Sequence, residues 1–322
     1  MIKRIVLMTA LMLAPSFVSA QTWVNGQIKF GPKLDTVKIT VTDTSLKTKT
    51  DTVIAVKVDT VITTKESISV TSFPFPTGKG VKIAVLDNGV DLTNPLFSGI
   101  TGTSTFGGVT GIDQSPDVCN GHGTAVTGLV RQFAPGATVY AVKVSAPFNG
   151  SCVTTGAALS AGLDWALANG IQVVNVSQQV PDSRALRAAF ANAVSRGLII
   201  IVAAGNNGGN VMTPASYPGV IAVASTGPTG AISSFSSRGT QVLLGAPGEA
   251  LAVWRTRNLT STGSGTSFST PIVTATVALM LEKNKTLTAS QIVNILCNSA
   301  TPNSGQTGCG VLNVQKSLAN TP

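Results

Sequence analysis

The chain contains one histidine, His122, which lies in the sequence NGHGT at residues 120–124. A glycine on each side leaves the imidazole uncrowded and lets the backbone turn sharply. Histidine is the side chain best suited to take up and return a proton near neutral pH. A single histidine is also often a surface or core residue, so His122 needs partners before it is interpreted as a catalytic base.

A carboxylate, Asp87, ends an apolar run that is rich in β-branched residues, VKIAVLDNG at residues 81–89. This run predicts a buried parallel strand that delivers Asp87 at its carboxyl end, which is where open α/β sheets place their sites. The alternative is an aspartate that only begins a turn.

A candidate nucleophile, Ser267, lies in GSGTSFSTP at residues 263–271, directly before the apolar stretch IVTATVALML. The pattern predicts a mostly buried helix with Ser267 at its start, near unpaired N–H groups and the positive end of the helix dipole. The alternative is a serine that only caps the helix.

Together the three motifs give the order Asp87, His122, Ser267, which differs from the chymotrypsin-like and α/β-hydrolase orders and is the subtilisin-like order. The chain lacks a Gly-x-Ser-x-Gly stretch, which argues against an α/β-hydrolase. From about Lys79 to its end, the chain resembles the subtilisin-like serine peptidases, or subtilases. The resemblance implies acyl transfer to Ser267, with His122 as the base and Asp87 orienting the imidazole.

The resemblance continues at AAGN, residues 203–206, which is similar to the family segment that supplies the asparagine of the oxyanion hole. An amide N–H of Asn206 can donate to the oxyanion that forms on the scissile carbonyl, although this tetrapeptide alone also fits an ordinary polar turn. The resemblance implies a peptide substrate bound as an extended strand. The expected substrate-binding residues are Ser145, Gly150, Ser151, Ser177, Gln178, Gln179, Ala204 and Gly205.

Five residues depart from the family pattern. Asn88 stands where the family usually has Ser or Thr, Ala125 replaces a second histidine, and Phe268 replaces the common Met after the nucleophile. Residues 177–179 read Ser-Gln-Gln where the family commonly has Ser-Leu-Gly along the substrate pocket. A side chain at Gln179 narrows that pocket or adds a polar contact, so substrate preference cannot be taken over from relatives.

From residue 81 onward, apolar β-type runs alternate with helical stretches, which predicts an α/β fold with a mostly parallel sheet and helices on both faces. The predicted strands are residues 81–86, 138–144, 171–176, 198–203, 220–224 and 242–245. The predicted helices are residues 123–133, 155–168, 183–196, 267–281 and 288–298. The peptidase domain is predicted to span residues 79–322.

Two segments precede this domain. Residues 1–20 have the charged, apolar and small-residue regions of a secretory signal, which predicts a secreted, periplasmic or cell-surface protein. Residues 21–78 are rich in Thr, Val and Lys, and Asp-Thr recurs at Asp35, Asp43, Asp51 and Asp59. This β-prone repeat segment is interpreted as a stalk, a linker or a prosegment.

The net charge is +9, but the basic residues are scattered and are not interleaved with aromatic residues, so we expect no nucleic-acid partner. After removal of the signal, no stretch is long and charge-free enough to span a membrane. The sequence makes no prediction of oligomeric state.

The four cysteines predict two disulfides in an exported chain. Because some secreted subtilases place a half-cystine where Cys119 lies, the resemblance favours the pairs Cys119–Cys152 and Cys297–Cys309 over the other two connectivities. Calcium commonly stabilises subtilases, but Asp113 and Asp117 fit no calcium motif, so a structural metal stays unassigned. No cofactor is expected for the chemistry.

The predicted function is therefore a secreted serine endopeptidase with an Asp-His-Ser triad. Two alternatives remain open. One is an inactive secreted binding protein on a subtilase scaffold, and the other is an esterase that uses the same triad.

Overall fold

The structure is a computed structural model that describes residues 76–105, 119, 121–149, 151–256, 259–303 and 308–322, with four short strands nearer the N-terminus. The chain divides into two units, Met1–Phe75 and Pro76–Pro322. In the first unit, β1 (Gln21–Val24) pairs with β2 (Gln27–Phe30), and β3 (Val37–Lys38) pairs with β4 (Ala55–Val56), both antiparallel. The predicted signal and most of the Asp-Thr repeat lie outside the described residues.

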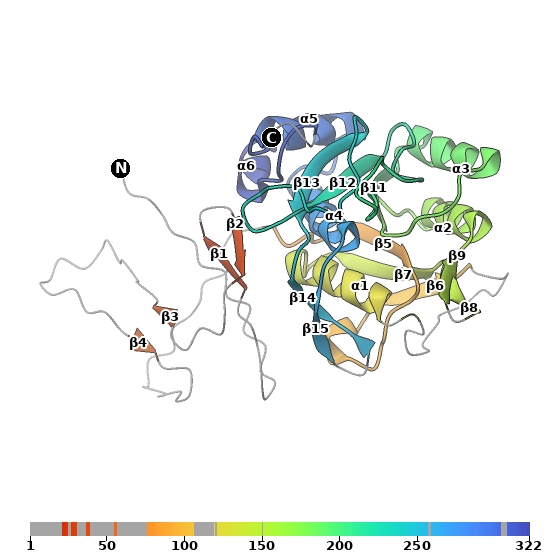
Figure 1. Cartoon of the computed structure of the whole chain (residues 1–322), viewed down its shortest axis with the longest axis horizontal. Coiled ribbons are helices and arrows are strands. Elements are labelled where there is room, and N and C mark those ends of the chain that lie inside the picture. The colour runs from red at the N-terminus through yellow and green to blue at the C-terminus, as the bar shows by residue number, and fades with distance from the viewer. Residues whose placement is uncertain are drawn as a thin grey trace, which may run out of the picture. The chain divides into compact units, whose positions relative to one another are not determined.

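The second unit is built on a seven-stranded parallel sheet with the order β13-β12-β11-β10-β5-β7-β6 (Figure 1). Its strands are β5 (Lys82–Asp87), β6 (Thr101–Ser104), β7 (Thr138–Lys143), β10 (Val173–Val176), β11 (Ile199–Ala203), β12 (Ile221–Thr226) and β13 (Val242–Pro247). The central strands are buried on both faces, as expected for apolar runs covered by helices.

One face of the sheet packs against α2 (Gly156–Ala168) and α3 (Arg184–Ser195). The core on this side contains Leu159 and Leu163 of α2 and Leu186 and Phe190 of α3, all fully buried. Each of the two helices begins at a hydroxyl N-cap, Thr155 for α2 and Ser183 for α3, because a side-chain oxygen there satisfies a free backbone N–H.

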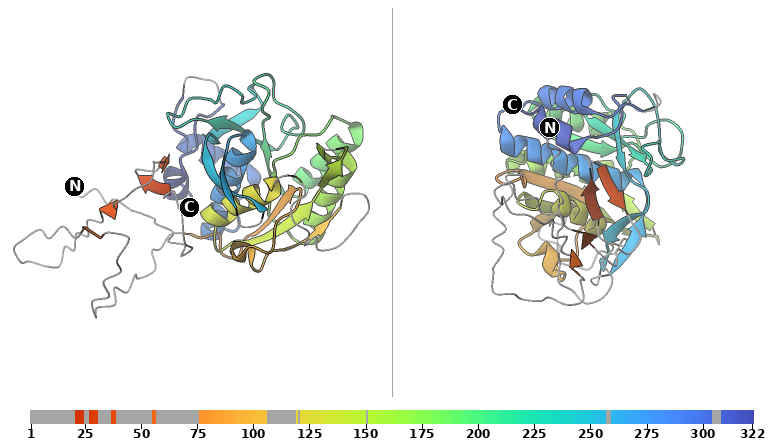
Figure 2. Two further views of the ribbon diagram at one scale, coloured as in Figure 1. Left: turned by 60° about the horizontal axis from the view of Figure 1, so that its bottom comes forward. Right: turned by 90° about the vertical axis from the view of Figure 1, so that its left-hand side faces the viewer.

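The other face is covered by α1 (His122–Phe133) and α4 (Thr266–Lys283), which pack against each other. In the left view of Figure 2 the strands lie between α2 and α3 on one side and α1 and α4 on the other. Residues 266–281 of α4 are all buried, so this helix forms the centre of the domain. Near the C-terminus, α5 (Ala289–Ser299) and α6 (Val314–Ala319) pack together.

The α/β fold predicted from the sequence is confirmed. The six predicted strands and five predicted helices are present, with ends shifted by a few residues. The sequence analysis missed β6 and α6, which are short, and two antiparallel hairpins. These are β8 (Ser145–Phe148) with β9 (Ser151–Thr154), and β14 (Leu251–Trp254) with β15 (Thr260–Gly263). Strands β8, β9 and β15 lack the apolar run on which the strand predictions depended, and in β14 that run is only four residues long.

Strand β5 lies between β10 and β7, where the chain order of the sheet reverses. In such sheets the carboxyl ends of the strands on either side of the reversal frame the site. The predicted catalytic residues follow these ends: Asp87 closes β5, and Asn206 follows β11. Among the helices with described placement, none combines the length and apolarity needed to cross a membrane.

Candidate active site

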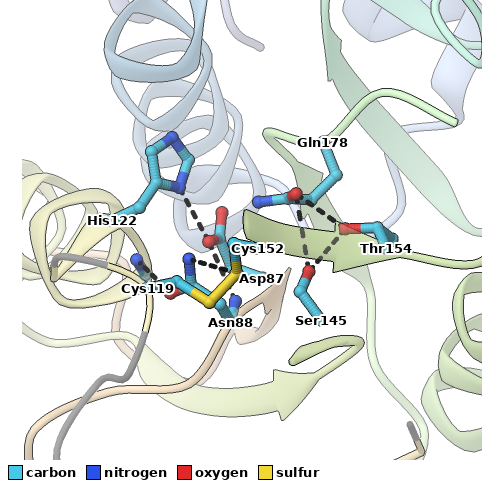
Figure 3. The surroundings of a disulfide bond; sticks show 9 residues. Asp87, Asn88, Cys119, His122, Ser145, Cys152, Thr154 and Gln178 are labelled. Carbon is cyan, nitrogen blue, oxygen red and sulfur yellow. Dashed lines mark hydrogen bonds and ion pairs between the residues drawn. A yellow bond between two sulfur atoms is a disulfide. The ribbon is translucent and has the colours of Figure 1, made fainter. Parts of the chain in front are cut away.

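A buried carboxylate and the only histidine are bonded at the carboxyl edge of the sheet. His122 Nδ1 lies 2.8 Å from Asp87 Oδ1, and the Asp87 side chain is 2% exposed. The same carboxylate oxygen accepts the backbone N–H of Asn88 at 2.9 Å. Asp87 Oδ2 is buried and has no hydrogen-bond partner among the described residues. Figure 3 shows Nδ1 turned toward Asp87 and the other ring nitrogen turned away from it.

The first turn of α1 is fastened to the end of β5 by Asn88. Its Oδ1 accepts the backbone N–H of Gly123 at 2.8 Å. Gly123 has to be glycine, because a Cβ there would lie 2.1 Å from the carbonyl oxygen of Gly89. This close approach sets the position of the neighbouring His122. Asn88, one of the departures from the family pattern, thus makes the local hydrogen bond that a shorter polar side chain would make.

The candidate nucleophile lies at the N-terminal end of α4, and the residue that follows it contacts the imidazole. The ring of Phe268, the next residue, has its centroid 5.8 Å from that of His122. Ser267 is buried, and its Oγ lies 3.4 Å from the carbonyl oxygen of Ser177. The helix N-cap is Gly265, which makes no side-chain cap bond, so Ser267 does not serve as the cap.

Two N–H donors lie on either side of Gly265: the side-chain Nδ2 of Asn206 and the backbone N–H of Ser267. Asn206 Oδ1 accepts both the backbone N–H and the Oγ1–H of Thr266, each at 2.9 Å, so Nδ2 is the arm of the amide left for other partners. A Cβ built on Gly265 would lie 3.5 Å from Asn206 Nδ2 and 3.8 Å from the backbone nitrogen of Ser267. Gly265 has φ 154°, which favours glycine, and its missing side chain leaves room between the two donors.

Four of the predicted substrate-binding residues lie at the carboxyl ends of two strands: one pair follows β10 and the other pair follows β11. Ser177 and Gln178 lie directly after β10, and Ser177 Oγ donates to the carbonyl oxygen of Ser267 at 2.9 Å. Ala204 and Gly205 are buried, and their backbone groups are bonded inside the domain: Ala204 to Val223 and Met212, Gly205 to Thr266 and Ser237. Gly150 and the side chain of Ser151 lie outside the described residues.

The loop that carries Gln178 and Gln179 also contains Asp182, which is held by two hydrogen-bond partners. Tyr217 donates its hydroxyl to Asp182 at 2.8 Å, and Arg187 donates to the same carboxylate. The Arg187 hydrogen bond holds the pKa of Asp182 below its usual range. Burial, with the Asp182 bond, raises the pKa of Tyr217 to about 12. Gln179 is half-buried in this loop.

Ser145 and Ser151, which the sequence analysis expects to bind substrate, lie in the β8–β9 hairpin. A disulfide joins Cys152 in β9 to Cys119, which lies three residues before His122, with the Cα atoms 5.4 Å apart. Figure 3 shows this bond beside Asp87 and Asn88. The second disulfide, Cys297–Cys309, has Cα atoms 4.9 Å apart and joins α5 to the segment that follows it.

Carboxylates do not cluster as a metal site in the part of the chain that the structure describes: no group of three or more His, Cys, Asp or Glu side chains occurs there. Asp113 and Asp117 lie outside the described residues. A structural calcium ion therefore stays unassigned, and the chemistry below uses none. Subtilases need no cofactor for catalysis.

Two positioning features were missed from the sequence. One is Thr266, whose hydroxyl and amide fix Asn206, and the other is Thr154, which bonds Gln178. Thr266 precedes the candidate nucleophile directly, but nothing in its sequence context indicates that it contacts a residue 60 positions away. Such contacts depend on how strands and helices meet at the sheet edge.

Comparison with known proteins places this geometry in a family. The subtilase family matches residues 78–315. Subtilisin DY from Bacillus licheniformis is 34% identical over 256 residues, covering 74% of this chain and 90% of that protein. An extracellular serine proteinase from a Thermus strain is 37% identical over 237 residues, covering 70% of this chain and 57% of that protein.

Among solved structures, a cold adapted subtilisin-like serine proteinase is similar to this chain with a TM-score of 0.64 and 32% identity. The similarity covers 74% of this chain and 88% of that one. Residues 78–315, which match the subtilase family, contain the whole seven-stranded sheet and the helices α1 to α5. The chain belongs to the subtilase family, and it is a serine-type endopeptidase.

Proposed function

We propose that this protein is an exported endopeptidase that cleaves peptide bonds through an acyl-enzyme on Ser267. The observation that carries the proposal is the 2.8 Å bond between Asp87 and His122 beside the N-terminus of α4. Asp87 accepts the Nδ1–H of His122, and the lone pair of Nε2 then takes up the Ser267 proton in the reaction. Ser267 Oγ then attacks the scissile carbonyl carbon, and His122 returns the proton to the leaving amine.

The negative charge that develops on the carbonyl oxygen needs donors in place before the reaction. Asn206 Nδ2 and the backbone N–H of Ser267 would supply them in the space beside Gly265. The N–H of Ser267 is one of the first four in α4, which have no partner within a helix. The dipole of α4 adds further stabilisation at its N-terminal end.

Export is the second part of the proposal. Residues 1–20 are predicted to be a signal that is removed, and two disulfides are typical of proteins that fold in an oxidising compartment. One relative is named an extracellular serine proteinase. Sequencing the N-terminus of the protein recovered outside the cell should give Gln21 as the first residue, or a residue near Lys79 if residues 21–78 are a prosegment that is also removed. A chain that keeps Met1 would contradict the cleavage.

The alternative of an inactive binding protein finds no support among the relatives, which are named as proteases. A fluorophosphonate probe tests the nucleophile, because it forms a covalent bond only with an activated serine. We expect the intact mass to rise by one probe and the label to map to Ser267. Ser267→Ala and His122→Ala should each abolish both labelling and hydrolysis of a protein substrate.

The matched control is Ser269→Ala, two residues along the same helix. Ser269 is buried, and its Oγ has no hydrogen-bond partner among the described residues. The Ser269→Ala protein should label and cleave like the unmodified protein. Retention of near-normal kcat by folded Ser267→Ala would contradict the triad. Hydrolysis of a simple ester without any hydrolysis of protein would instead favour the esterase.

A further inference from the structure

Three polar side chains form a hydrogen-bonded group at the rim of the active site, and we call Ser145, Thr154 and Gln178 the polar triangle. Ser145 Oγ and Thr154 Oγ1 lie 2.5 Å apart, and Thr154 Oγ1 donates to Gln178 Oε1 at 2.8 Å. Ser145 Oγ also lies 3.5 Å from the same amide oxygen. Figure 3 shows the triangle on the opposite side of Asp87 from the His122 ring.

In the structure, the oxygen end of the Gln178 carboxamide faces the hairpin, where it accepts from Thr154. Each hydroxyl carries one proton, so a Ser145 that donates to Thr154 leaves Thr154 free to donate to the amide oxygen. The amide nitrogen, Nε2, then points away with two N–H donors. No acceptor for these donors occurs among the described residues. In Figure 3, Nε2 is on the side of the carboxamide that is turned toward Asp87 and His122.

The backbone of the same segment is held against the candidate nucleophile. Ser177, the residue before Gln178, donates its Oγ to the carbonyl oxygen of Ser267 at 2.9 Å and also accepts from Asn175 Nδ2 at 3.0 Å. A peptide whose scissile carbonyl reaches Ser267 therefore brings its neighbouring residues past Gln178. The Gln178 side chain is half-buried, so a bound peptide can contact it.

We propose that Gln178 is a specificity-determining residue whose Nε2 donates a hydrogen bond to a side-chain oxygen of the peptide substrate. This inference rests on the proposed peptidase function and concerns the choice of peptide. An Asn, Asp, Gln or Glu side chain supplies the acceptor. An apolar side chain at the same position would cover the two N–H groups without pairing them, which costs binding free energy.

Two other roles for Gln178 make different predictions. If Nε2 contacted a main-chain carbonyl of the substrate, loss of the contact would weaken all peptides equally. If the polar triangle only held the β8–β9 hairpin in place, replacement of Gln178 would lower stability and leave the preference among peptides unchanged. A preference that changes with the chemistry of residue 178 separates the proposal from both.

The experiment measures peptide choice in two ways. Fluorescent peptides that differ at one position, with Asn, Asp, Leu or Lys there, are bound to the Ser267→Ala protein and followed by anisotropy. The same peptides are then hydrolysed by the protein with Ser267 intact, and kcat/KM is compared. At one position we expect Asn or Asp to be favoured over Leu by about tenfold in both measurements.

Variants at residue 178 then test the donor. Gln178→Leu should abolish the preference for Asn and Asp. Gln178→Glu keeps an oxygen for Thr154 but turns the other arm into a charged acceptor, so the preference should shift to Lys. Gln315→Leu, the same change at an exposed residue of α6, is the control and should keep the original preference.

The proposal is overturned if Gln178→Leu and Gln178→Glu keep the original order of peptides, or if every peptide weakens by the same factor. Binding to the Ser267→Ala protein separates this failure from failure of the peptidase function, because binding needs no turnover. Selective binding without hydrolysis would contradict the peptidase function alone. Hydrolysis without selectivity would contradict the role of Gln178 alone.

Discussion

Helix α4 carries a different polar group at each end, and the two ends illustrate two uses of the same helix. At 18 residues, α4 is about 27 Å long and runs through the centre of the domain. Its N-terminal end holds Ser267 at the carboxyl edge of the sheet, near the bonded pair Asp87 and His122. Its C-terminal end holds Glu282, near the point where the chain enters the domain.

Glu282 is bound entirely by backbone. Its Oε2 accepts the N–H groups of Thr77, Gly78 and Lys79 at 2.5, 2.6 and 3.0 Å. These residues lead directly into β5, and Val81 N–H closes the turn by donating to the carbonyl oxygen of Gly78. The carboxylate thus fixes the start of the central strand whose other end is Asp87.

The helix dipole explains why the two ends differ. The positive N-terminal end favours a developing negative charge, so the dipole helps a nucleophilic serine there. A carboxylate at the negative C-terminal end is unfavourable by itself, so Glu282 depends on its three N–H donors. Asp87 has the opposite imbalance, because one of its buried oxygens has no partner among the described residues. We infer that the N-terminal end of α4, at the active site (the site end), is reactive at a cost in stability. The C-terminal end, at Glu282, instead stabilises the fold.

The largest effect is expected for Asp87→Asn at the site end. The amide still fits but no longer accepts the Nδ1–H of His122 as a carboxylate does, so the imidazole loses the correct tautomer. We expect kcat to fall by about 10⁴, as in other triad enzymes, while the free energy of unfolding changes little. Steady-state kinetics and urea unfolding of the same preparation measure both. A large loss of stability would show that Asp87 also holds the fold together.

Asn206→Ala is expected to have the next largest effect. The variant removes Nδ2 from the space beside Gly265, and kcat should fall by about 10² to 10³, a magnitude known from subtilisin itself. KM should change little, because this hydrogen bond forms mainly in the transition state. Thr266 loses two hydrogen bonds to Oδ1 in the same variant, so its thermal unfolding is measured alongside. A loss confined to KM would argue against a role in the oxyanion hole.

How much the sequence predicts differs between the two ends of α4. The site end is predicted from the sequence, because each of its residues lies in a short motif: Asp87 after a strand, His122 between glycines, Ser267 before an apolar helix. The role of Glu282 was not predicted. It binds residues 203 to 205 positions away through backbone N–H groups, which leave no trace in side-chain patterns. The polar triangle was also missed, because its hydrogen bonds join side chains 9 to 33 positions apart, although Ser145 and Gln178 were expected to contact substrate.

The two disulfides extend the comparison, since only one of them lies at the site end. Cys119–Cys152 closes a loop of 33 residues, and Cys297–Cys309 closes one of 12. Loop-closure entropy gives each bond about 3 to 4 kcal/mol of stability. Serine at both positions of either pair should lower the melting temperature. Only the Cys119–Cys152 pair should also lower kcat/KM, because that bond connects the segment before His122 to the β8–β9 hairpin.

Non-reducing peptide mapping tests the pairing on which this prediction depends. It should recover Cys119 with Cys152 and Cys297 with Cys309. A linkage between Cys119 and Cys297, or free thiols in the exported protein, would contradict it. Equal losses of kcat/KM in the two double variants would show that the first bond does not shape the substrate edge.

The smallest effect, and the test of the other end of α4, is expected for Glu282→Gln. This is the same change as Asp87→Asn, a carboxylate replaced by its amide, so any difference between the variants comes from position. A neutral oxygen accepts hydrogen bonds from the three N–H groups less strongly, which lowers the stability. Removal of the unfavourable negative charge at the C-terminal end of the helix offsets part of this lowering. We expect the free energy of unfolding to fall by about 1 to 2 kcal/mol, with kcat unchanged.

Glu249→Gln is the control for Glu282→Gln. The Glu249 side chain accepts no hydrogen bond among the described residues, so this variant should change neither the free energy of unfolding nor kcat. Urea unfolding gives the difference in the free energy of unfolding. The value of kcat is measured at urea concentrations well below the unfolding transition, where both variants are folded. A fall in kcat in Glu282→Gln would mean that the start of β5 sets the position of Asp87 at its end. The two ends of α4 would then act as one unit, and the division between reactivity and stability would be wrong.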